Sequence, residues 1–230
     1  MEKEFKKRIL SSILIIPLAF FFILQGSMLF AFFLGILFIV TSNEWIKMIK
    51  KSLFIKFIGV FFIFFSFYST YQLRNFQESA SLINIFEKNQ IFIFIILICI
   101  FTDIGGYVFG KIFKGPKLSK ISPNKTYSGL LGSFILPFIV GLIYIKYYNF
   151  AGTYYIEKLN FLSDNKQLNL LFFIIFVSLI SQLGDLIISF FKRKAKIKDT
   201  GNLIPGHGGL LDRIDGLIFV MPILYLILEY

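Results

Sequence analysis

The segment from Ser189 to Asp215 holds the residue types that phosphate chemistry requires. Its glycines and one proline give an irregular backbone whose N–H groups can face oxyanions, and its basic side chains can neutralise phosphates. Asp212 and Asp215 offer hard oxygen ligands of the kind that Mg²⁺ prefers. A solvated cluster that only attracts anionic lipid would explain the lysines, but not the acids and glycines between them. We predict a phosphate site here, with candidate residues Lys192, Arg193, Lys198, Asp199, His207, Gly208, Gly209, Asp212, Arg213 and Asp215.

Two further acids lie inside strongly apolar runs. Asp103 follows Phe101-Thr102, and Asp185 follows Leu183-Gly184. An aspartate at the centre of a membrane helix costs about 2.5 to 3.5 kcal/mol on insertion scales, so such residues are functional candidates. A helix cap or an interhelical hydrogen bond is the structural alternative for each. We predict that both lie close to the basic segments, where they can reach the same substrates.

A third polar cluster runs from Ser122 to Gly129 and precedes an apolar segment. Lys125 and the hydroxyls of Ser122 and Thr126 can hold phosphate. A simple turn with a helix N-cap explains the same residues without a ligand. The sequence is consistent with both a phosphate site and a turn that caps a helix.

The elements that position these residues are predicted to be membrane helices. Of the 230 residues, 57% are hydrophobic and 32 are Phe, with a mean hydropathy of +0.77, which is too apolar for one soluble core. The expected fold is an all-α polytopic bundle of about seven spans, within a range of seven to nine. The predicted spans are Ile9 to Leu24, Ser27 to Thr41, Leu53 to Leu73, Gln90 to Phe109, Leu130 to Tyr147, Leu168 to Phe190 and Gly216 to Leu228.

The basic residues predict the orientation of these spans. Alternating seven spans from a cytosolic N-terminus places residues 1–8, 42–52, 110–129 and 191–215 inside. With Lys56 included, these segments carry 19 of the 24 basic residues, the bias that the positive-inside rule describes. We divide the chain into an N-terminal region, 1–88, with three spans and a catalytic region, 89–230, with cytosolic loops 110–129 and 191–215. Most of the residues behind the net charge of +11 are then expected at the cytosolic face of the membrane. No nucleic-acid partner is expected.

The pattern of Ser189 to Asp215 resembles the signature of the phosphatidate cytidylyltransferase family: Ser, Lys-Arg, Lys-Asp, Ile-Pro-Gly-His-Gly-Gly-Leu and Asp-Arg-Ile-Asp stand at the family's spacing. The resemblance extends to Gly184-Asp185-Leu186, to Asp103 with Gly106-Tyr107, to Ser-Pro-Asn-Lys-Thr, and to Glu44-Trp45. One position departs from it, because Ser128 stands where the family usually has an acid.

The resemblance implies that a phosphatidate oxygen attacks the α-phosphorus of CTP, which releases pyrophosphate and forms CDP-diacylglycerol. It implies a Mg²⁺ site shared by Asp185 and Asp212, with Asp215 as an alternative ligand or a residue that supports the ligands, and Asp103 as a weaker candidate. Lys125, Lys192, Arg193, Lys198 and Arg213 would contact phosphates, and His207 a phosphate or a metal-bound water. A homodimer in a bacterial inner membrane, with its active site on the cytosolic face, is expected. A second, monovalent cation such as K⁺ is a further candidate cofactor.

Two other classes of protein, membrane transporters and membrane enzymes of related chemistry, share some of these features. A membrane transporter would also carry intramembrane acids, but its site would lie near the bilayer midplane. A CTP-dependent lipid kinase could combine acids and basic loops in the same way. A CDP-alcohol phosphotransferase would need an Asp-x₃-Asp pattern, which Asp212-x₂-Asp215 does not supply.

Overall fold

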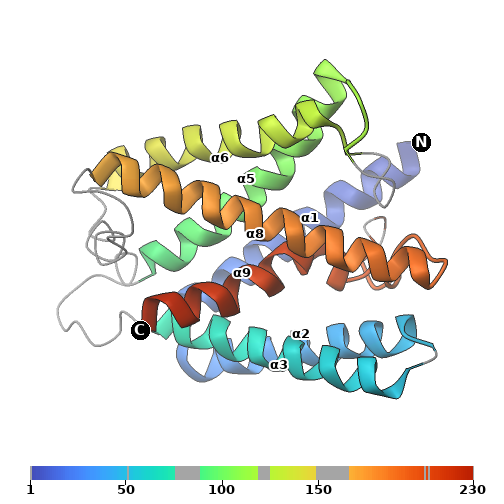
Figure 1. The fold of residues 1–230 in the computed structure, drawn as a ribbon. Coiled ribbons are helices and arrows are strands. Elements are labelled where there is room, and N and C mark those ends of the chain that lie inside the picture. Colours follow the sequence, from blue (N-terminus) through green and yellow to red (C-terminus); the bar gives the residue numbers. More distant parts are fainter. Residues whose placement is uncertain are drawn as a thin grey trace. The chain divides into compact units, whose positions relative to one another are not determined.

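The computed structural model describes residues 2–50, 52–75, 89–118, 125–148, 166–204, 206 and 208–229, and this part of the chain is helical without a named strand (Figure 1). One helix stands at each of the seven predicted spans. Their bounds are α1 Glu2–Gln25, α2 Ser27–Met48, α3 Leu53–Asn75, α5 Gln90–Phe113, α6 Tyr127–Tyr148, α8 Lys166–Lys194 and α9 Leu211–Glu229.

Five of these helices, namely α2, α3, α5, α6 and α8, are long and apolar enough to cross a membrane. In α1 the apolar segment that the structure describes is Ile15–Gln25, which is shorter than the apolar segments of these five helices. The all-helical, multi-pass architecture is therefore confirmed. The number of spans and the cytosolic N-terminus remain predictions.

Two predicted boundaries differ from the structure at functionally important places. The second span was predicted to end at Thr41, but α2 continues to Met48 and includes Glu44. The last span was predicted to begin at Gly216, but α9 begins at Leu211 and includes Asp212. Glu44 and Asp212 both accept hydrogen bonds inside the protein. Each charge is therefore tolerated within its helix, and the helix extends beyond the apolar run.

The chain forms two compact units, and the first combines residues 1–81 with 190–225. Within it, α2 and α3 lie side by side (Figure 1). The ring of Phe38 contacts Phe64 and Phe67, and Ser66 donates a hydrogen bond to the Ile218 carbonyl of α9. The signature segment therefore folds against the N-terminal helices. The predicted functional division at residue 89 is not tested by this grouping.

Gly26 lies in the turn between α1 and α2, where the sequence predicts the boundary between the first two spans. Its φ of +61° is favoured by glycine, and a Cβ there would overlap the guanidinium of Arg74. Arg74 is buried and donates to the carbonyls of Ile23 and Leu24, at 3.2 and 3.5 Å. A cation on the last carbonyls of a helix satisfies groups that have no partner within that helix.

The second unit combines residues 82–189 with 226–230, and glycines bring α5 and α6 together in it. A Cβ at Gly105 would overlap the backbone of Gly132, and one at Gly129 would lie 2.6 Å from the Gly106 carbonyl oxygen. Such small-residue contacts let two helices approach closely where no hydrophobic force drives their association. Thr102 of α5 also donates to Ser178 of α8 at 2.9 Å.

Replacing Gly105 by Ala is expected to destabilise the protein, because the added Cβ meets backbone that cannot move aside. Overpacking of this kind costs about 1 to 3 kcal/mol. Gly35→Ala on α2 is the matched control, since a Cβ there has nothing within 4 Å. Thermal unfolding in detergent should show a lower Tm for Gly105→Ala and an equal or higher Tm for Gly35→Ala. Equal Tm values for both variants would contradict close α5–α6 packing.

Candidate functional site

Asp212 is the centre of a buried hydrogen-bond cluster in the first unit. Its side chain is 5% exposed. Its Oδ2 accepts hydrogen bonds from the backbone N–H groups of Thr200, at 2.8 Å, and Gly209, at 3.1 Å. The Thr200 hydroxyl lies 3.0 Å from the same oxygen. These contacts join the beginning of α9 to two points of the loop that precedes it, Thr200 and Gly209.

Glu44 reaches the same cluster from the last turns of α2. Its Oε1 accepts from Leu210 N at 2.9 Å, and its Oε2 accepts from Leu211 N at 2.8 Å. The first N–H groups of a helix lack partners within that helix, so Glu44 caps α9 from another element. Its carboxylate is buried, yet its oxygens point at donors.

Thr200 connects the two carboxylates. Its Oγ1 lies 2.9 Å from Glu44 Oε2 and 3.0 Å from Asp212 Oδ2. A hydroxyl has a single proton, so it can donate to only one of the two at a time. Gly209 fits beside it because a Cβ there would overlap the Thr200 hydroxyl and lie 2.6 Å from Glu44 Oε2.

Lys192 supplies the positive charge of this cluster. Its Nζ lies 2.8 Å from Asp212 Oδ1, and the two side chains are 11% and 5% exposed. Removing one partner of such a buried pair leaves an uncompensated charge and typically costs 3 to 5 kcal/mol. The predicted phosphate ligand Lys192 is therefore held in place by the predicted metal ligand Asp212.

A second acid–base pair lies in the other unit. Lys125 Nζ is 2.5 Å from Asp185 Oδ2, and their side chains are 28% and 25% exposed. Ser189 donates to Asp185 Oδ1 at 3.2 Å. Part of this pair stays in contact with solvent, which is the situation that a charged ligand would require.

The structure supports the capping interpretation for Thr126. Its Oγ1 accepts a hydrogen bond from Gly129 N at 3.1 Å, the geometry of an N-cap at the start of α6. Ser128, which replaces the family's usual acid, lies 3.0 Å from Thr126 Oγ1 and donates to the Lys114 carbonyl. In this chain Ser128 ties the first turn of α6 to the end of α5.

The remaining predicted residues are more dispersed. Asp215 is buried, and its Oδ1 accepts from Gly216 N at 2.9 Å. Gly208 has a φ of +87°, and a Cβ there would lie 3.2 Å from Asp212 Oδ2. Ser122 and His207 lie outside the described residues. The exposed members of the set are Asp103, Arg193, Lys198, Asp199 and Arg213.

The predicted Mg²⁺ ligands have suitable chemistry but already have cationic partners. Carboxylate oxygens are the donors that Mg²⁺ prefers. Asp212 Oδ1 has a second lone pair beside its bond from Lys192, so a cation can bind there only next to that ammonium or in its place. No group of three His, Cys, Asp or Glu suited to a metal occurs among the described residues. Asp185 and Asp212 belong to different units, so a shared ion stays a prediction.

Glu44 and Thr200 are the parts of the site that sequence reasoning missed. The sequence indicates Glu44 only through the family resemblance, and a predicted span that ends at Thr41 leaves Glu44 in a loop. The available signal was an acid at the end of an apolar helix, which needs a partner wherever it is buried. Thr200 gave no signal, because a threonine next to glycine in a polar loop is unremarkable without its neighbours in space.

Comparison with known proteins adds an independent finding. Residues 52–230 match the model of the cytidylyltransferase family. A Rickettsia bellii protein named phosphatidate cytidylyltransferase is 35% identical over 225 residues, which cover 96% of this chain and 89% of that protein. A Rickettsia conorii protein of the same name is 34% identical over 228 residues, or 97% and 90% of the two chains. One from Staphylococcus aureus strain COL is 41% identical over 133 residues, or 57% and 46%.

Changing Glu44 to Gln should destabilise the protein by about 1 to 3 kcal/mol, the cost of leaving buried donors unsatisfied. An amide has one accepting oxygen, so its NH₂ group would face one of the N–H donors of Leu210 and Leu211. Lys47→Gln is the control, because Lys47 is exposed on the same helix end. Denaturant unfolding should give a lower free energy of unfolding for Glu44→Gln than for Lys47→Gln. Equal unfolding free energies would mean that Glu44 does not hold α9.

Proposed function

We propose that this chain, which belongs to the cytidylyltransferase family, is a phosphatidate cytidylyltransferase. It transfers CMP from CTP to phosphatidic acid and gives CDP-diacylglycerol and pyrophosphate in phospholipid biosynthesis. The observation that carries this proposal is the signature segment itself, folded around the buried Asp212–Lys192 pair. The names of relatives that align with nearly the whole chain support it.

The reaction asks little covalent work of the protein. A phosphate oxygen of phosphatidate forms a bond to the α-phosphorus of CTP, and the bond from that phosphorus to the bridging oxygen breaks. Pyrophosphate leaves with the electron pair. The attacking oxygen is already ionised, so no general base is needed. Positioning the two anions and neutralising their charge are then the main tasks of the chain.

The two lysines held by aspartates are suited to positioning. Asp212 fixes the ammonium of Lys192, and Asp185 fixes that of Lys125, so neither side chain has to be ordered when a phosphate arrives. Exposed Arg193, Lys198 and Arg213 can then reach phosphates from the solvent side. An arginine binds a phosphate through two parallel hydrogen bonds, which orients it as well as attracting it.

Mg²⁺ is the proposed cofactor, with Asp185 and Asp212 as its proposed ligands and Asp215 as an alternative ligand or a residue that supports them. When bound, the ion would withdraw negative charge from the phosphates of CTP. The family pattern supports this assignment, together with the hard oxygens of these side chains. A monovalent cation such as K⁺ is a second candidate ion.

The remaining proposals concern the setting of the enzyme. The excess of lysine and arginine on four segments supports an N-terminus and an active site on the cytosolic face of a bacterial inner membrane. There CTP is available from the cytosol, and phosphatidate from the bilayer. A homodimer is proposed from the family resemblance alone.

Purified protein incubated with labelled CTP, phosphatidate and Mg²⁺ should form labelled CDP-diacylglycerol and release pyrophosphate. Both products follow from attack on the α-phosphorus, and chromatography of lipid and aqueous phases detects them. CDP as the nucleotide product would instead indicate a CTP-dependent lipid kinase. No conversion of CTP would favour the transporter alternative.

Asp212→Asn should lower the rate of CMP transfer by at least about 100-fold, the effect typical of losing an electrostatic contact in an active site. Lys192 would remain buried without a carboxylate, so stability should fall as well. The double variant Asp212→Asn/Lys192→Gln removes both charges and should recover part of the lost Tm but none of the activity. Recovery of activity in the double variant would show that Asp212 acts only in folding.

A further inference from the structure

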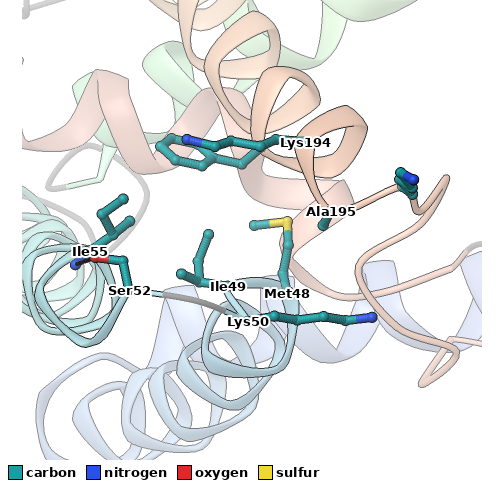
Figure 2. A pocket seen from close by; sticks show the side chains of 9 residues that line it. Met48, Ile49, Lys50, Ser52, Ile55, Lys194 and Ala195 are labelled. Atoms are coloured by element: carbon teal, nitrogen blue, oxygen red, sulfur yellow. Dashed lines mark hydrogen bonds between the residues drawn. The ribbon is translucent and has the colours of Figure 1, made fainter.

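A groove lies beside the end of α8, the helix that carries Lys192. It is formed within the first unit by the end of α2, the beginning of α3 and the end of α8, and its volume is about 390 Å³. Figure 2 shows the side chains around it. The lining residues are Met48, Ile49, Lys50, Ser52, Ile55, Phe191, Lys194, Ala195 and Lys196.

The groove combines positive charge with an apolar floor. Lys50, Lys194 and Lys196 are exposed, and no acid occurs among the lining residues. Met48 and Ile49 are 2% and 8% exposed, and their side chains lie between Lys50 and Lys194 in Figure 2. A site of this composition favours a ligand that carries a phosphate at one end and hydrocarbon at the other.

The groove and the buried cluster around Asp212 lie on different faces of the end of α8. Phe191 and Lys194 are three residues apart, so they share one face of α8. Ala195 follows in the turn directly after the helix, and its N–H donates to the Phe191 carbonyl at 2.9 Å. Lys192 is one residue after Phe191, so its side chain points about 100° away from that of Phe191 around the helix axis. It pairs with Asp212 and not with the groove. Backbone bonds from Lys196 N to Arg193 O and from Ile197 N to Lys192 O, both 3.0 Å, close the helix and fix this arrangement.

We propose that this groove binds the headgroup of an anionic phospholipid, with its phosphate among the three amines and its glycerol on the apolar floor. The position favours a lipid over a soluble anion, because α2, α3 and α8 are long enough to cross a membrane and their ends meet here. The start of α3 also exposes apolar side chains along which acyl chains can lie, namely Leu53, Phe54, Phe57 and Phe61. This site goes beyond the proposed function: filling it requires neither CTP nor the signature aspartates.

The chain carries its own reporter for this site. Trp45 is the one tryptophan in the sequence. Its ring contacts that of the lining residue Phe191, with centroids 4.9 Å apart, and its Nε1 donates to the Ile55 carbonyl at 3.3 Å. Fluorescence quenching by brominated lipids therefore measures which lipid occupies the groove.

The full-length protein is placed in phosphatidylcholine bilayers that contain brominated phosphatidylglycerol, an anionic lipid that is not the proposed substrate. Quenching should exceed that by brominated phosphatidylcholine at the same mole fraction. In Lys50→Gln/Lys194→Gln/Lys196→Gln, the apparent affinity for phosphatidylglycerol should fall at least about tenfold, because the three cations that line the groove can no longer donate to the phosphate. Lys111→Gln/Lys114→Gln/Lys117→Gln removes three exposed lysines outside the groove and should leave the affinity unchanged.

Ala195→Phe places a ring in the groove without changing the charge, so it should weaken the preference for phosphatidylglycerol. Equal losses in the two lysine variants, or full binding in Ala195→Phe, would reduce the effect to general charge attraction and overturn the proposal. Millimolar inorganic phosphate that displaces the lipid would identify a soluble-anion site instead. Asp212→Asn should bind phosphatidylglycerol like the wild type, so failure of CMP transfer and failure of this site are distinguishable.

Discussion

The buried cluster of Glu44, Thr200, Asp212 and Lys192 is the interaction on which the signature segment depends. Two carboxylates and one ammonium are largely removed from water, which is unfavourable for each charge alone. Burial is tolerated because their oxygens meet backbone N–H groups at the start of α9 and in the loop before it. The loop must adopt a conformation that presents all these donors, so the cluster selects one backbone path.

The rest of the signature follows from that constraint. Side chains that hold the backbone are buried, whereas Arg193, Lys198 and Arg213 remain exposed and can meet charged substrates. In the other unit, Thr126 caps the start of α6 next to Lys125, and its hydroxyl lies against Gly110 of α5. Exposure thus distinguishes Arg193, Lys198 and Arg213 from Lys192 and Asp212, which are held in place by their own contacts.

Much of this could be predicted from the sequence, because long apolar runs and a dense polar signature are strong signals. One helix stands at each predicted span, and the family is confirmed. Glu44 was misplaced in a loop because hydropathy averages over neighbours and cannot recognise an acid that finds its donors 166 residues later. For Asp212, spacing alone could not show that Lys192 and backbone amides already occupy its oxygens.

The central claim is that Glu44 and Asp212 act as one unit in holding this backbone. A double-mutant cycle of Glu44→Gln and Asp212→Asn, measured as unfolding free energy, tests it most directly. Groups in one hydrogen-bond network typically show interaction energies of about 0.5 to 3 kcal/mol, and at least about 1 kcal/mol is expected here. Additivity within about 0.3 kcal/mol, as for distant and independent sites, would contradict the account.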